Sequence, residues 1–90
     1  MSINIEISSI FGRYTNNQLV IPVKGNTVGE CVQDLVGQYP DLKKVLLNQQ
    51  GNLLYSYEVY INGESAYPNE MAKPVKDGDK LNIVMIIHGG

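Results

Sequence analysis

The most constraining stretch of this sequence is its last apolar run, Lys80 to Ile87, which is followed by His88 and two glycines. Successive side chains of a β-strand point to opposite faces of a sheet. Both faces of this run are apolar in its second half, with Leu81, Ile83, Met85 and Ile87 on one side and Val84 and Ile86 on the other. A strand that is apolar on both faces is typical of the middle of a sheet. The rest of the chain must therefore supply neighbouring strands.

Two stretches near the N-terminus fit that requirement. Apolar and polar residues alternate from Ile3 to Ile7, and Leu19, Ile21 and Val23 recur at every second position, which is the spacing of half-buried strands. The intervening Gly12 to Asn17 is rich in residues that tolerate turns. We therefore predict an antiparallel hairpin with a long loop. Pro22 removes one hydrogen-bond donor, so the second strand is expected at an edge or to be irregular there.

A helix is predicted after this hairpin. Thr27 and Glu30 have the spacing of a capping box, in which the hydroxyl accepts from the Glu30 amide and the carboxylate reaches back. Apolar residues follow at helical spacing, namely Val28, Cys31, Val32, Leu35, Val36 and Tyr39. Pro40 disfavours helix at the preceding residue. A further short turn over Leu42 to Leu46 is expected to pack on the core.

The second half of the chain predicts two more strands before the last one. Tyr55 to Ile61 is rich in aromatic and β-branched residues, and Asn62-Gly63 is a strong hairpin signal. Glu64 to Tyr67 would be a short return strand, and Asp77-Gly78-Asp79 a tight turn that starts the final strand. The element order indicates one α+β domain over residues 1–90, in which a mixed sheet of four to five strands packs on one main helix.

Composition narrows the possible functions. The chain has 90 residues, a net charge of −2, one cysteine and one histidine. A single cysteine forms no internal disulfide, and one cysteine far from one histidine makes no recognisable zinc site. The only adjacent pair of basic residues is Lys43-Lys44, which argues against nucleic acid or an anionic membrane as the main partner. We expect a cytoplasmic domain without a membrane span or signal peptide.

Four motifs together carry a family resemblance. They are Gly25-Asn-Thr-Val28, Leu35 to Pro40, Val59-Tyr-Ile-Asn-Gly63, and Pro74-Val-Lys-Asp-Gly-Asp79 leading to the diglycine. In this order, over essentially the whole chain, the sequence resembles the sulfur-carrier branch of the ubiquitin-like β-grasp proteins, of the ThiS and MoaD types. The loop from Ile10 to Thr15 is most similar to that of the thiocarboxylate carriers of cysteine biosynthesis. Met85, Ile86 and His88 stand where relatives often carry prolines and an alanine.

The resemblance implies a function carried by the C-terminal residue. A ubiquitin-activating-type partner (ThiF/MoeB-like) would adenylate Gly90 with MgATP, and a sulfur donor would then convert Gly90 to a thiocarboxylate. A sulfur-accepting synthase of cysteine or molybdopterin biosynthesis, or less readily of thiamine biosynthesis, would take the sulfur. The chain itself would bind no cofactor and would not be an enzyme.

The residues themselves favour the same end of the chain. Glycine lacks a Cβ, so Gly89 and Gly90 can pass a narrow channel and adopt backbone angles closed to other residues. We expect a flexible tail over residues 88–90, in which His88 is either a recognition residue or a solvated residue leaving the sheet. The candidate partner-binding residues are Val84 and Ile86, with Phe11 and Tyr60 as weaker candidates. Val84 and Ile86 would otherwise lie under a loop.

Other roles fit some of the same residues. Cys31 lies on the apolar helix stripe, which predicts a small buried side chain rather than a persulfide relay. A protein modifier would form an isopeptide bond through Gly90, as ubiquitin does, starting from the same adenylate. A plain β-grasp interaction module would not use its tail, so deletion of Gly89 and Gly90 separates that reading from the other two.

Overall fold

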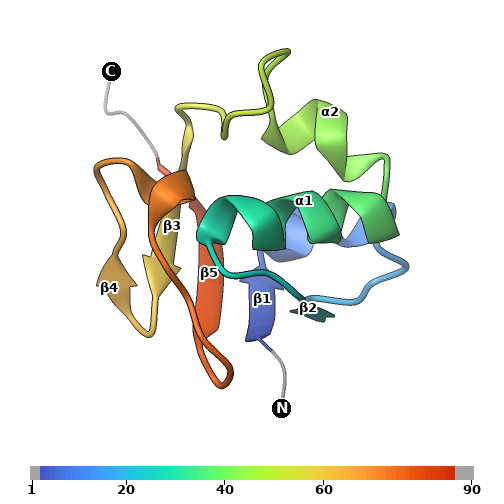
Figure 1. Ribbon diagram of the computed structural model, residues 1–90. Helices are drawn as coiled ribbons and strands as arrows, with labels where there is room; N and C mark the ends of the chain where they lie inside the picture. The colour runs from blue at the N-terminus through green and yellow to red at the C-terminus, as the bar shows by residue number, and fades with distance from the viewer. Residues whose placement is uncertain (1–2, 87–90) are drawn as a thin grey trace.

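Strand β5 (Lys80–Met85) lies in the centre of a five-stranded sheet with the order β2-β1-β5-β3-β4 (Figure 1). The computed structural model describes residues 3–86. β5 runs parallel to β1 (Ile3–Ile7) and antiparallel to β3 (Tyr57–Ile61). The central position predicted from the two apolar faces of this strand is therefore confirmed. Ile87, the last residue of the predicted strand, lies outside the described residues.

The N-terminal hairpin is also confirmed, but its connection is more regular than predicted. β1 pairs antiparallel with β2 (Val20–Val23), and β2 forms an edge of the sheet, as Pro22 indicated. A 3₁₀ helix, η1 (Ser9–Tyr14), begins before the predicted turn and overlaps its first residues. Ser8, which precedes η1, accepts a hydrogen bond from Ile10 N at 3.4 Å. Phe11 holds this helix in place because its buried ring meets the Tyr57 ring edge to face, with centroids 5.6 Å apart.

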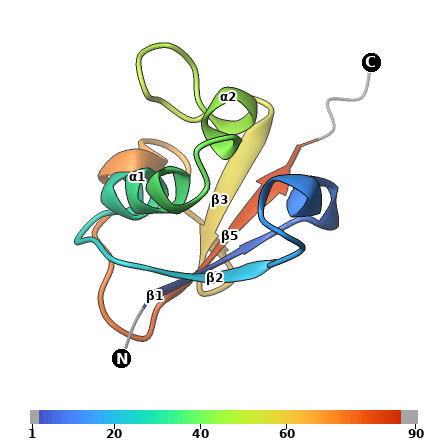
Figure 2. The same ribbon diagram turned by 90° about the vertical axis from the view of Figure 1, so that its right-hand side faces the viewer.

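Two α-helices, α1 (Val28–Gln38) and α2 (Leu42–Leu46), lie on the same side of the sheet (Figure 2). Thr27 Oγ1 accepts from Glu30 N at 3.1 Å, as predicted, and Glu30 Oε1 accepts from Asn26 N at 2.8 Å. The apolar stripe of α1 packs into the sheet. Leu35, Leu42 and Leu81, from α1, α2 and β5, each have no exposed surface, so one core joins both layers.

The other half of the sheet is a short hairpin. β4 (Glu64–Ser65) pairs antiparallel with β3 through a two-residue turn in which Asn62 and Gly63 have φ values of 51° and 87°. Positive φ at both central residues is what such a hairpin turn requires. β4 is shorter than predicted, because beyond Ser65 only Ala66 N continues the ladder, donating to Val59 O at 2.9 Å. A second 3₁₀ helix, η2 (Glu70–Ala72), follows.

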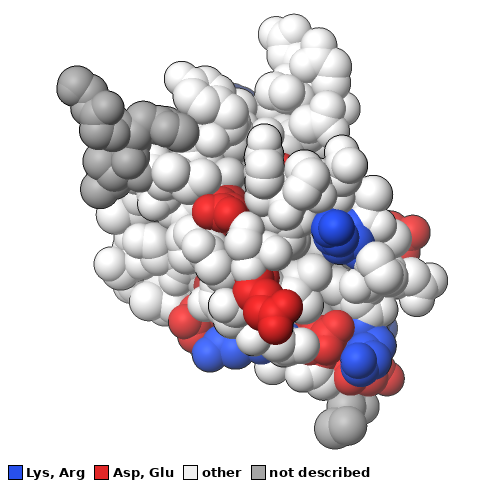
Figure 3. Space-filling model, turned by 90° about the vertical axis from the view of Figure 1, so that its left-hand side faces the viewer, with Lys and Arg blue, Asp and Glu red and all other residues white. Residues whose placement is uncertain are grey.

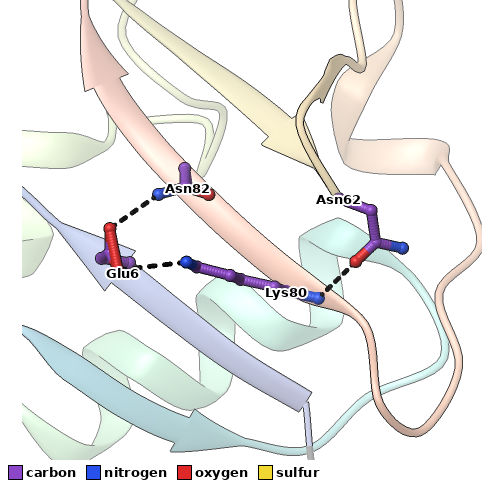
Figure 4. Close-up of polar contacts among 4 residues, drawn as sticks. All are labelled: Glu6, Asn62, Lys80 and Asn82. Carbon is purple, nitrogen blue, oxygen red and sulfur yellow. Dashed lines mark hydrogen bonds and ion pairs between the residues drawn. The ribbon is translucent and has the colours of Figure 1, made fainter.

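A set of hydrogen bonds, here called the Asn62–Asp79 clamp, fixes the start of β5. Asn62 Oδ1 accepts from Lys80 N at 2.9 Å (Figure 4), and Asn62 Nδ2 donates to Asp79 Oδ1 at 2.9 Å. Asp79 Oδ2 also accepts from Lys76 N at 2.9 Å. The hairpin turn is therefore tied to the turn before β5, which sets the position of the last strand in the sheet.

Two glycines of α1 give a matched test of the packing. A Cβ on Gly29 would lie 2.9 Å from the backbone oxygen of Met71 in η2, whereas a Cβ on Gly37 would meet nothing within 4 Å. Gly29→Ala is expected to lower the free energy of unfolding by about 1–3 kcal/mol, because η2 must shift. Gly37→Ala is expected to raise it by about 0.4–1 kcal/mol. Urea titration measures both changes in the free energy of unfolding. A change of the same sign in the two variants would contradict the contact described between Gly29 and η2.

The clamp also predicts how stability depends on pH. The hydrogen bonds from Asn62 and then from Lys76 N lower the pKa of Asp79 below its ordinary value of 3.8. The carboxylate therefore stabilises the fold above the unfolded pKa, and this stabilisation is lost as the pH falls through the folded pKa. Asp79→Asn is expected to be less stable at neutral pH and to lose less stability on acidification.

Urea titrations at neutral pH and below pH 3.8 check this expectation for the wild type and Asp79→Asn. Asp77→Asn, an exposed position in the same turn, serves as the control. If the control variant flattens the pH dependence as much as Asp79→Asn does, the clamp is not the cause.

Candidate functional site

The sheet face away from α1 and α2 (Figure 2) is here called the open face. From the pairing register, all five strands contribute side chains to it. These residues alternate with the buried ones, because successive strand residues point to opposite sides. From the pairing register, the open face carries Asn4, Glu6, Val20, Pro22, Glu58, Tyr60, Ser65, Lys80, Asn82 and Val84. None of these side chains belongs to the buried core.

The structure brings together three of the predicted partner-binding residues on this face. Val84 is paired with Glu58 across β3 and β5, and Tyr60 is paired with Asn82. Ile86 N donates to Ser56 O at 2.7 Å, so the ladder continues and Ile86 falls on the same side as Val84. Val84, Ile86 and Tyr60 are all half-buried, which leaves part of each side chain available for contact.

The fourth candidate, Phe11, is corrected by the structure. Its side chain is only 3% exposed and belongs to the core, on the helix side of the sheet. The apolar character that suggested a docking role serves instead to anchor η1 against Tyr57. Phe11 is therefore a structural residue and not part of the open face.

A polar network occupies the middle of the open face (Figure 4). Glu6 Oε1 accepts from Asn82 Nδ2 at 3.1 Å, and Lys80 Nζ lies 3.4 Å from Glu6 Oε2. Next to this network, a shallow hollow of about 330 Å³ lies between β1 and β5 and is lined in part by Glu6, Ser8, Asn82 and Val84. The hollow lies beside the end of β5, after which the chain continues toward its C-terminus.

The described residues hold little other reactive chemistry. Among residues 3–86 there is no cluster of three or more His, Cys, Asp and Glu side chains that could bind a metal. No helix in that range is long and apolar enough to cross a membrane. The predicted functional residues His88, Gly89 and Gly90 lie outside the described residues.

Cys31 has the buried position that its place on the helix stripe predicted. Its side chain is fully buried. Burial, and to a lesser extent the charges of Asp34 and Glu30, raises the pKa of the thiol above its ordinary value. A thiol of this kind stays protonated and shielded, which is the opposite of what a persulfide relay requires.

With this geometry established, the sequence was compared with known proteins. It matches the model of the ThiS family over residues 2–90. The chain belongs to the ThiS family. This agrees with the resemblance carried by the four sequence motifs.

Individual relatives are similar over their whole length. The ThiS-family chain is 26% identical over 93 residues to the sulfur carrier protein CysO of Mycobacterium tuberculosis, with both sequences covered completely. It also superposes on a chain in the crystal structure of the Amycolatopsis orientalis BexX/CysO complex with a TM-score of 0.86 and 28% identity, covering 99% of this chain and 100% of that one.

A more distant likeness extends to another group of proteins. The structure of SAMP1 from Haloferax volcanii matches with a TM-score of 0.83 and 24% identity over all of both chains. At this level of identity the likeness concerns the fold alone. Together with the CysO structures, it confirms the ubiquitin-like β-grasp fold predicted from the sequence.

Glu58 is one of the open-face residues that no sequence motif singled out. Glu58 accepts a hydrogen bond from the Ser65 hydroxyl on β4. Its position two residues before Tyr60 placed it on the same face once the strand was predicted. What the alternation could not show is that Ser65 holds the carboxylate, because that contact depends on the register of the β3–β4 hairpin.

The burial of Cys31 predicts a low reactivity. In the native protein a maleimide is expected to label the thiol hardly at all, whereas in urea the labelling is expected to be complete, because the reactive thiolate needs both exposure and deprotonation. Mass spectrometry of timed samples measures the difference, with Cys31→Ala as the blank. Rapid labelling of the folded protein would contradict the buried position.

Proposed function

We propose that this chain is a sulfur carrier and that the carboxyl carbon of Gly90 is its reactive atom. The observation that carries the proposal is the match to the ThiS family over residues 2–90. The CysO relatives, which are named as sulfur carrier proteins, support it. The buried position of the only cysteine, Cys31, agrees with a reactive atom that lies elsewhere than on this thiol.

The chemistry explains why activation is needed. A carboxylate is a poor electrophile, so a partner enzyme first joins Gly90 to AMP, as one carboxylate oxygen attacks the α-phosphate of MgATP and pyrophosphate leaves. A sulfide or persulfide sulfur then attacks the acyl carbon, and AMP leaves. After a persulfide attack, a thiol attacks the outer sulfur of the acyl disulfide, so that the thiocarboxylate leaves and a disulfide forms on the sulfur donor. In this scheme the chain is a substrate of its partners rather than an enzyme.

The fold limits where the activating partner can bind. Gly90 is the fourth residue after Ile86, and four extended residues span at most about 14 Å. An enzyme that holds Gly90 in its active site must therefore lie close to the end of β5. Among the apolar side chains of the open face, Val84 and Ile86 are the described ones nearest to that point along the chain.

The recipient of the sulfur is proposed from the relatives. Two of the matched proteins, from Mycobacterium tuberculosis and Mycobacterium bovis, carry the name CysO. The loop from Ile10 to Thr15, which forms most of η1, was the sequence feature that favoured the cysteine-pathway carriers. We therefore propose a synthase of cysteine formation as the acceptor, ahead of the molybdopterin and thiamine pathways.

Intact mass spectrometry tests the proposal. The protein is incubated with MgATP, sulfide and an adenylating enzyme of the ubiquitin-activating type from the same organism. We expect the mass change for replacement of one oxygen by sulfur, located to Gly90 by fragmentation. A variant lacking Gly89 and Gly90 is expected to show no change and to keep its melting temperature, because β5 ends at Met85.

Two results would contradict the proposal. One is no mass change of the wild type with every adenylating enzyme of that organism. The other is the appearance of Gly90 joined to lysine side chains of other proteins without a thiocarboxylate, which would favour a protein modifier.

A further inference from the structure

The open face carries one unbalanced charge. Among the strand residues that point this way, the charged side chains are Glu6, Lys80 and Glu58. Glu6 and Lys80 form an ion pair at 3.4 Å. Glu58 on β3 is therefore left as the net charge of the face. On the β4 side of the molecule, acidic and basic side chains lie in the middle and lower part of the surface, with uncharged side chains above them (Figure 3).

Glu58 is held in place rather than free in solvent. The Ser65 hydroxyl donates to Glu58 Oε1, and Ser65 Oγ in turn accepts from Tyr67 N at 3.2 Å. Among residues 3–86, Ser65 is the only hydrogen-bond donor to this carboxylate, so its second oxygen can accept from a partner. A carboxylate fixed in this way loses little side-chain entropy when it binds.

The surroundings of Glu58 favour a particular kind of donor. Val84 lies directly across the ladder from Glu58, at the distance where paired side chains touch, so an apolar side chain neighbours the carboxylate. Tyr60 is two residues along the same face, about 7 Å away. A guanidinium can donate to the free oxygen while its flat face covers the Tyr60 ring, whereas a strongly hydrated ammonium group does not match this setting.

We propose that Glu58, Tyr60 and Val84 form the recognition site for an arginine of the adenylating partner. The inference rests on the proposed function, because the short reach from Ile86 to Gly90 brings that partner to this end of the sheet. Glu58 is a specificity residue in this scheme: it binds the partner and takes no part in the chemistry at Gly90. The arginine lies in an apolar part of the partner surface that covers Val84 and Ile86.

Glu58→Gln tests this proposal, since it removes the charge and keeps the size of the side chain. In ATP–pyrophosphate exchange with the enzyme that activates the wild type, the KM for this chain is expected to rise about tenfold with kcat unchanged. Glu64→Gln is the matched control, because Glu64 is an exposed carboxylate on β4 that points to the helix side, opposite Ile61. Its KM is expected to change less than about twofold.

Ionic strength gives a second readout. The wild-type KM is expected to rise with salt, and the KM of Glu58→Gln is expected to rise much less, because the charge pair is already absent. A structural role of Glu58 would instead lower the melting temperature without changing the salt dependence. Glu58→Gln is expected to melt within a few degrees of the wild type.

The outcomes separate this inference from the proposed function. If the wild type is adenylated and the KM of Glu58→Gln is unchanged, or rises no more than that of Glu64→Gln, the recognition site is wrong and the carrier function stands. If no enzyme adenylates the wild type, both are wrong. A carbodiimide cross-link from Glu58 to a partner lysine would overturn the assignment to arginine, because a guanidinium does not form this amide.

Discussion

The parallel pairing of β1 with β5 is the constraint on which the rest of the structure depends. It joins Asn4 to Lys80 and Ile7 to Ile83, residues from nearly opposite ends of the sequence. Parallel neighbours cannot be joined by a tight turn, so the chain between them must cross one face of the sheet. That crossing contains α1 and α2, which cover this face and leave the other open. The open face is thus a consequence of the chain path.

Much of this arrangement could be predicted from the sequence. Apolar residues on both faces of Leu81 to Ile86 placed the strand in the middle of the sheet, and Pro22 placed β2 at its edge. Both predictions depend on properties of a residue and its immediate neighbours. The Asn62-Gly63 turn was predictable for the same reason, since its positive φ angles are a local requirement.

The parts that could not be predicted depend on contacts between distant residues. η1 is held by Phe11 against Tyr57. No local pattern reports that pair, so Phe11 was predicted as a weaker candidate for partner binding. The role of Glu58 likewise depends on Ser65 in the next strand. Of the candidate site, the open-face positions of Val84, Ile86 and Tyr60 followed from period-two alternation. The ion pair between Glu6 and Lys80, and the unpaired charge of Glu58 that remains, could be identified only from the register of the strands.

The polar network of the open face also fixes the pairing of β5. Asn82 and Lys80 meet Glu6 from one side of the strand, while Leu81 and Ile83 are buried on the other. A shift of one residue would turn Lys80 and Asn82 toward the core and expose the leucine and isoleucine. Because the strand is apolar on both faces further along, these two polar residues supply most of the difference between correct and shifted pairing.

The position of β5 has a consequence for how the nascent chain folds on the ribosome. The central strand of the sheet is the last described element to be synthesised. Until it emerges, β1 and β3 have no neighbour between them, and the core beneath α1 lacks Leu81 and Ile83. A nascent chain of this architecture therefore completes its sheet only after β5 has emerged from the ribosome. Gly90 follows β5 in the sequence, so it is synthesised after every described element of the fold.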